Sequence, residues 1–142
     1  MSTPALSIRN QLSGTVAGIT AGTVMATVRV RLSGGQVVTA AITLDAVADL
    51  GLAEGSAVLA LAKSTEIALA AGPVPGLSIR NQLPGTVTEV TVGGAMATVR
   101  LAVPGGELTS AVTREAVAEL GLAAGASAVA LIKSTELSLA LA

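Results

Sequence analysis

The sequence predicts an all-β protein of two tandem barrels, each an OB-like Greek-key β-barrel (the oligonucleotide/oligosaccharide-binding type) with one short helix. Three observations predict this fold. The chain repeats itself, each copy alternates apolar and polar residues with the period of a strand, and a capped helix of about two turns recurs at the same place in both copies. Several short strands and one helix within about 70 residues are typical of such barrels.

The repeat is the strongest of these observations. LSIRNQL at residues 6–12 recurs at 77–83, and KSTE at residues 63–66 recurs at 133–136. Similarity that extends along nearly the whole chain is typical of a duplicated structural unit. We therefore expect both copies to fold in the same way.

The segment between the copies predicts a linker. AAGPVPG at residues 70–76 holds two prolines and two glycines, a composition typical of a short and fairly stiff connection. We expect a first domain over residues 1–71, a linker over 72–76 and a second domain over 77–142.

Alternation predicts the strands. Residues 25–32 read MATVRVRL, in which every second side chain is apolar. This period of two places the apolar side chains on one buried face and Arg29 on the solvated face, and Arg100 takes the same place in the second copy. Paired glycines follow at 34–35 and again at 105–106, where they predict hairpin turns.

The predicted helix follows the expected hairpin of each copy. Thr43 can cap it, Asp45 suits the positive end of its first turn, and Gly51 can end it in a left-handed conformation. Thr113 and Gly121 can take the same roles in the second copy.

Composition excludes much chemistry. The 142 residues contain no Cys, His, Phe, Trp or Tyr, so the chain cannot form disulfides, metal sites built on Cys or His, or Ser-His and Cys-His catalytic pairs. A net charge of −1 argues against a general electrostatic grip on nucleic acid or on an anionic membrane. Hydrophobic residues make up 51% of the chain, and this excess predicts self-association because a small domain leaves much apolar surface exposed. The opening residues, MSTPALSIR, lack the pattern of a signal peptide, so we expect a cytoplasmic protein.

The basic residues are few and repeat-equivalent. Both lysines of the chain, Lys63 and Lys133, occupy the same place in the two copies and are followed by Ser-Thr. In a strand, Ser7 and Arg9 would face the same side, and a hydroxyl beside a guanidinium suits an oxyanion. With Lys63 and Ser64 from another strand, these donors could surround a tetrahedral dianion and balance its charge.

Simpler interpretations compete with this one. Arg29 and Arg100 fit solvated strand positions that keep the sheet soluble. Lys63 and Lys133 could form weak surface ion pairs with the glutamates of their own KSTE motifs.

Three ordered motifs, S-x-R-N-Q-L-x-G-x-V, I-T-x-x-A-V-A-x-L-G-L and K-S-T-E, resemble the Mop family over nearly the whole chain. The resemblance implies a homotrimer of two-domain chains that holds molybdate or tungstate at domain and subunit interfaces, with no catalytic cofactor and no metal ion ligated directly by the protein. Ala46 and Ala116 stand where related regulators often have Ser, so one hydroxyl donor is missing. The positions that match the family's binding residues are Ser7, Arg9, Thr43, Lys63, Ser64, Ser78, Arg80, Thr113, Lys133 and Ser134.

Other function classes receive less support. The carboxylates are scattered without the pairing that acid–base catalysis needs, so we do not expect an enzyme. A nucleic-acid-binding barrel stacks bases on aromatic side chains, which this chain lacks. The sequence therefore predicts a cytoplasmic oxyanion-binding protein with no nucleic-acid or membrane partner, and the resemblance to the Mop family implies molybdate or tungstate storage and homeostasis. A structural oligomerisation module without a ligand remains the alternative, and equilibrium binding of oxyanions would separate the two.

Overall fold

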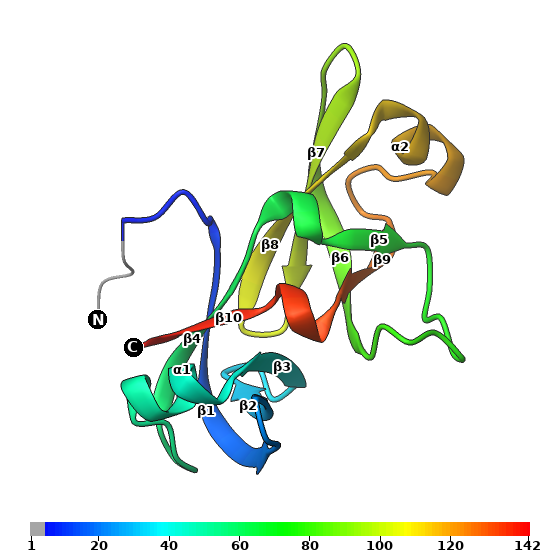
Figure 1. The fold of residues 1–142 in the computed structure, drawn as a ribbon. Coiled ribbons are helices and arrows are strands. Elements are labelled where there is room, and N and C mark those ends of the chain that lie inside the picture. The colour runs from blue at the N-terminus through cyan, green and yellow to red at the C-terminus, as the bar shows by residue number, and fades with distance from the viewer. Residues whose placement is uncertain (1–4) are drawn as a thin grey trace.

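The computed structural model describes residues 5–142, which form two five-stranded antiparallel sheets (Figure 1). Two α-helices of seven residues and two short 3₁₀ turns complete the described elements. In chain order these are β1 (Asn10–Ala21), β2 (Met25–Leu32), β3 (Val37–Thr43), α1 (Leu44–Leu50), β4 (Ala57–Ala62), η1 (Ser64–Glu66), β5 (Ala68–Ala70), β6 (Asn81–Val92), β7 (Met96–Val103), β8 (Gly106–Thr113), α2 (Arg114–Leu120), β9 (Ser127–Ile132), η2 (Ser134–Glu136) and β10 (Ser138–Leu141).

Each sheet curls into a small barrel. The strand order is β10-β4-β1-β2-β3 in the first sheet and β5-β9-β6-β7-β8 in the second. The two edge strands of each sheet also contact one another, β10 against β3 and β5 against β8, which brings each sheet towards closure. The prediction of two tandem OB-like barrels, each with one short helix, is confirmed.

The two copies exchange their last strands. β5 of the first copy pairs with β9 of the second, with Ala68 opposite Leu131. β10 of the second copy pairs with β4 of the first, with Ser138 opposite Leu61. The predicted ranges 1–71 and 77–142 therefore describe copies of the sequence, whereas each barrel in space takes four strands from one copy and its fifth from the other.

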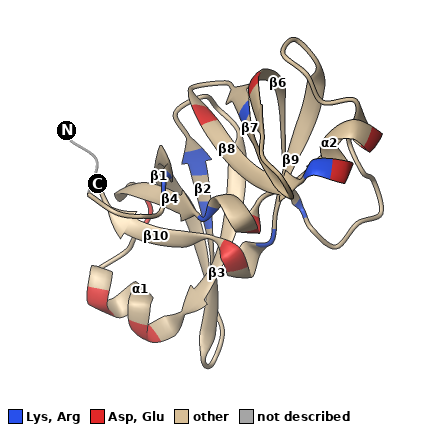
Figure 2. Cartoon of the chain, turned by 90° about the horizontal axis from the view of Figure 1, so that it is seen from above, with Lys and Arg blue, Asp and Glu red and all other residues tan. Residues whose placement is uncertain are grey.

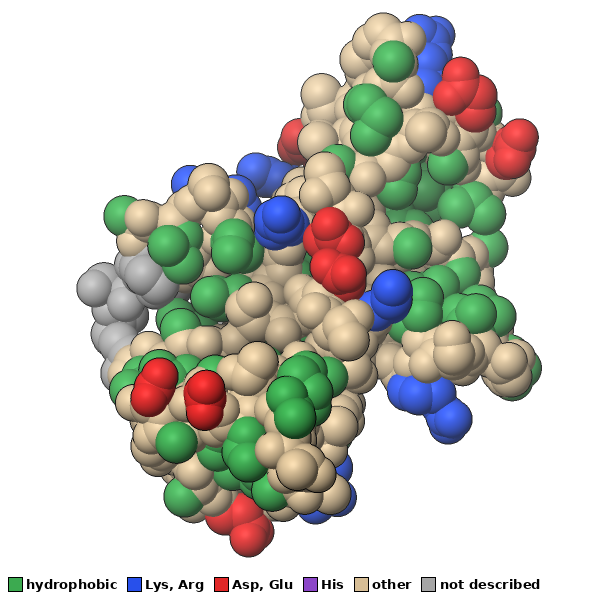
Figure 3. Space-filling model, in the orientation of Figure 1, with side chains coloured by type: hydrophobic (Ala, Val, Ile, Leu, Met, Phe, Trp, Pro, Cys, Tyr) green, Lys and Arg blue, Asp and Glu red, His purple; other side chains and the backbone are tan. Residues whose placement is uncertain are grey.

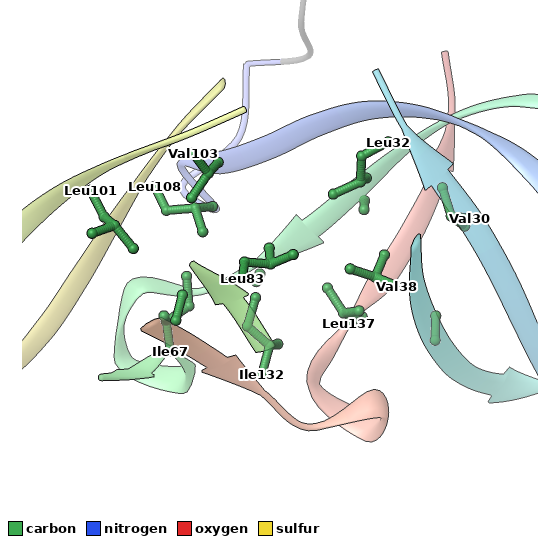
Figure 4. Packing of buried hydrophobic residues seen from close by; sticks show 14 of the residues in the cluster. Val30, Leu32, Val38, Ile67, Leu83, Leu101, Val103, Leu108, Ile132 and Leu137 are labelled. Atoms are coloured by element: carbon green, nitrogen blue, oxygen red, sulfur yellow. The ribbon is translucent and has the colours of Figure 1, made fainter. Parts of the chain in front are cut away.

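The alternation predicted for residues 25–32 is confirmed. Along β2, burial alternates strictly, and Val28 and Val30 have no exposed surface. Because of the strand exchange, the apolar core is continuous across the two copies. In Figure 4, Leu83 and Ile132 lie between Ile67 on one side and Leu137 on the other, all within one cluster of buried residues.

The predicted helix caps are confirmed. The Thr43 hydroxyl accepts a hydrogen bond from the backbone N–H of Ala46 at 3.1 Å, and Thr113 does the same for Ala116 at 3.1 Å. Gly51 ends α1 at φ 60°, a left-handed conformation that favours glycine. Neither helix in residues 5–142 has the length and apolar character needed to cross a membrane.

Candidate functional site

Residues 7–9 do not form a strand, so the prediction that Ser7 and Arg9 share one face of a strand was wrong. β1 begins at Asn10, which lies opposite Ala62, the last residue of β4. Within residues 5–142, no neighbouring strand continues beyond that point to pair with Arg9. The carbonyl of Ile8 instead accepts a hydrogen bond from the Gln11 side-chain amide at 3.0 Å, which fixes a local turn.

The register nevertheless places two of the predicted donors, Arg9 and Lys63, at adjoining strand ends. Since Asn10 lies opposite Ala62, Arg9 immediately precedes and Lys63 immediately follows the last paired residues of β1 and β4. The second copy repeats this arrangement, with Asn81 opposite Ile132 at the ends of β6 and β9. We call these two groups the first basic cluster (Ser7, Arg9, Lys63 and Ser64) and the second basic cluster (Ser78, Arg80, Lys133 and Ser134).

The cations of both clusters are exposed, and Ser64 and Ser134 are half-buried. Within residues 5–142, the one ion pair closer than 4.0 Å joins Arg100 to Glu107 at 3.9 Å, and both side chains of that pair are about half exposed. The ion pair between Lys63 and the Glu66 carboxylate, which the simpler interpretation required, is therefore not formed. The positive charge of each cluster is available to an anion.

The clusters lie at the junction of the two barrels. η1, which begins at Ser64, packs on β8 of the other copy, and η2 packs on β3. Figure 3 shows basic and acidic side chains close together where the two lobes of the molecule meet. In Figure 2 the strand β2 carries basic residues, and the acidic residues of α1 lie on the outside of the molecule.

One buried asparagine connects each cluster to the other copy, a role that the sequence did not predict. The Asn10 side chain is 3% exposed; its oxygen accepts from the N–H of Thr109 at 2.7 Å, and its nitrogen donates to the Thr109 carbonyl at 2.9 Å. Asn81 binds the backbone of Thr39 in the same way, with both distances 2.8 Å. The available signal was that the chain's two asparagines occupy the same place in the repeat.

Thr43 and Thr113 do not join the clusters within one chain. Thr43 is four residues beyond Thr39 on β3, which corresponds to about 13 Å along a strand. Its exposed hydroxyl oxygen accepts from the helix N–H, so its proton stays available to a further acceptor.

The linker packs against the second cluster. Gln82 holds Val74 through two hydrogen bonds, accepting from its N–H at 3.0 Å and donating to its carbonyl at 2.9 Å. This segment and Arg80 line the same cavity of about 390 Å³, so the linker lies beside the second cluster.

Comparisons with known proteins match both copies. A model of the TOBE domain matches residues 6–69 and again 77–139. The chain is 40% identical over 135 residues to the molybdenum transport protein ModE of Azotobacter vinelandii, covering 94% of this chain and 50% of that protein. It is 42% identical over 137 residues to the molybdenum-pterin-binding protein MopB of Rhodobacter capsulatus, covering 95% of this chain and 51% of that protein. The chain thus spans about half the length of these two relatives.

A solved structure matches the whole fold. The cytoplasmic molybdate-binding protein ModG, crystallised with molybdate bound, superposes with a TM-score of 0.94 at 42% sequence identity, covering 98% of this chain and 100% of that one. These similarities confirm the resemblance to the Mop family that the three motifs indicated. Because the family model matches both copies over most of their length, the chain belongs to the TOBE-domain family, with two such domains in tandem.

Proposed function

We propose that this chain binds molybdate or tungstate as a tetrahedral dianion at the two basic clusters, for storage and homeostasis in the cytoplasm. The observation that carries the proposal is the strand register, which places repeat-equivalent Arg and Lys residues, with Ser close by in the sequence, at the adjoining ends of β1 and β4, and of β6 and β9. Charge-assisted hydrogen bonds from guanidinium, ammonium and hydroxyl groups are suited to such an ion. The protein would hold the ion by hydrogen bonds, without direct ligation of the metal, a catalytic cofactor or a covalent step.

The relatives support this proposal. ModG is described as a cytoplasmic molybdate-binding protein, and its structure contains molybdate. MopB and ModE are named for molybdenum-pterin binding and molybdenum transport. The near-identity of the ModG fold makes an oxyanion site a better account of the clusters than an oligomerisation module without a ligand.

We propose further that a homotrimer completes each site. Thr43 and Thr113 lie away from the clusters of their own chain, so these hydroxyls would reach an ion only from a neighbouring chain. Large apolar side chains are exposed at the two hairpin tips, where Val24 is 70% exposed and Met25 and Met96 are 43% and 49% exposed. Association of chains would cover this surface, and closed cyclic symmetry is the usual outcome.

Equilibrium dialysis with molybdate at physiological salt tests the proposal. We expect tight retention by the wild type, loss of a subset of sites in Lys63→Ala and in Lys133→Ala, and little competition from chloride. Arg31→Ala is the matched control. Arg31 lies opposite Thr15, which is five residues along β1 from Asn10, the end of the strand at the first cluster. Normal binding by both lysine variants would show that the lysines are ordinary surface residues.

Light scattering tests the assembly separately. We expect light scattering to show a trimer. We expect its thermal midpoint, followed by circular dichroism, to rise with molybdate but not with an equal concentration of chloride. A ligand that binds only the assembled state stabilises that state by mass action, by about 2.7 kcal/mol when its concentration is 100 times the dissociation constant. A monomer, or a midpoint indifferent to molybdate, would contradict the interface model.

A further inference from the structure

Asn10 and Asn81 are buried polar side chains, each 3% exposed. A buried primary amide is costly unless its oxygen and both N–H groups find partners. In Asn10, the two bonds to the Thr109 backbone account for the oxygen and for one N–H. They also fix which end of the amide carries the nitrogen, since the Thr109 N–H can donate only to an oxygen.

The remaining N–H of each asparagine faces a serine of the adjacent cluster. The Asn10 nitrogen lies 3.5 Å from the Ser64 hydroxyl oxygen, and the Asn81 nitrogen lies 3.5 Å from that of Ser134. These are long, weak hydrogen bonds, and both copies form them independently. Because the group that faces the serine is a donor, the serine oxygen accepts and its own proton stays available.

An oxyanion offers only acceptor atoms, so a serine helps to bind it only when its hydroxyl donates. We propose, resting on the function proposed above, that Asn10 and Asn81 are positioning residues that keep Ser64 and Ser134 as donors towards the bound dianion. Each asparagine holds this orientation only while it is docked on the other copy of the repeat. The junction of the two barrels is in this way part of each binding site.

Side-chain amide spectra of the ¹⁵N-labelled full chain give a direct test, because the chain contains only two asparagines. On saturation with molybdate, the side-chain amide signals of Asn10 and Asn81 should both shift. In Ser64→Ala the response of Asn10 should disappear and that of Asn81 should remain. Gln36 is an internal reference, because its amide donates to Pro104 in the hairpin region and not to a residue of either cluster.

A double-mutant cycle tests whether Asn10 acts through Ser64. All four proteins carry Lys133→Ala, so that dialysis reports binding at the first cluster. One has no further substitution, one adds Ser64→Ala, one adds Asn10→Ala, and one adds both Ser64→Ala and Asn10→Ala. We expect Asn10→Ala to weaken molybdate binding about tenfold when Ser64 is present and less than about twofold when it is absent. Melting of each protein without molybdate checks that it is folded.

The outcomes separate the two proposals. If the wild type binds molybdate but the asparagine signals do not shift, or if the two substitutions are additive, the positioning role is refuted and the binding function stands. If the wild type retains no molybdate, the proposed function fails, and the positioning role fails with it. Should Asn10→Ala not fold, the spectra of the wild type and of Ser64→Ala still decide the matter.

Discussion

The exchange of β5 and β10 can be tested by crosslinking, because the chain has no cysteine and an engineered pair is unambiguous. Ser138 lies opposite Leu61 in the structure. Residues opposite each other in antiparallel strands have Cα atoms about 4.5–5.5 Å apart, within the range that a disulfide accepts. Leu61→Cys/Ser138→Cys should therefore oxidise to a crosslink within one chain.

The matched control is Leu131→Cys/Ser138→Cys. Leu131 is the counterpart of Leu61 in the repeat, and it would face Ser138 if each copy kept its own last strand. In the structure Leu131 instead lies opposite Ala68. We expect this control pair to stay reduced.

The stabilisation from the crosslink can be calculated from the loop that it closes. Joining residues 61 and 138 closes a loop of about 77 residues, for which the chain-entropy model gives about 4.5 kcal/mol at 25 °C. For a chain of this size that corresponds to a rise of the thermal midpoint on the order of 10 °C. Comparing the oxidised and reduced forms of the same variant by circular dichroism cancels the cost of shortening Leu61.

The result is read on a non-reducing gel and by mass spectrometry of the digested protein. Crosslinking of the control pair in preference to the Leu61 pair would refute the exchange. A disulfide between two chains would show that the strands are exchanged between molecules and not within one.

Two further predictions concern stability. Gly85→Ala should lower the free energy of unfolding, measured in urea, by about 1–3 kcal/mol, because a Cβ there would clash with the carbonyl oxygen of Ala102. Gly94→Ala, whose Cβ would have no neighbouring atom within 4 Å, should be neutral or slightly stabilising. Ser110→Ala should cost about 1–2 kcal/mol, because the buried hydroxyl donates to the Ile67 carbonyl at 2.5 Å and its loss leaves that acceptor unpaired. Equal urea midpoints for the two glycine variants, or an unchanged midpoint for Ser110→Ala, would contradict these arguments.

Features of the fold with local causes could be predicted from the sequence. Alternation along β2 and the caps at Thr43 and Gly51 depend on residues within a few positions of one another, and the structure has them as expected. The strand exchange could not be predicted in this way. β4 and β9 are equivalent strands in a repeated sequence, so their edges offer β10 nearly the same pairing partner, and only the path of the chain after η2 decides between them.

The candidate site shows the same division. Residue types predicted oxyanion donors, and strand register brought Arg9 next to Lys63. The prediction of a strand at Ser7 was wrong because β4, the pairing partner, ends at Ala62. The sequence of residues 7–9 gives no information about where that partner strand ends. The contact between Asn10 and Thr109 joins residues far apart in the chain, and no local pattern predicts such a contact.

Strand exchange also sets an order for folding during synthesis. Strands β1 to β4 of the first barrel leave the ribosome well before β10, which pairs with β4. At about 5–20 residues per second, the edge of β4 waits on the order of ten seconds for that partner. During this interval β5, the counterpart of β10, is the nearest strand that could occupy the edge. The first barrel therefore reaches its final form only when the second copy has been made, and the two barrels mature as one unit.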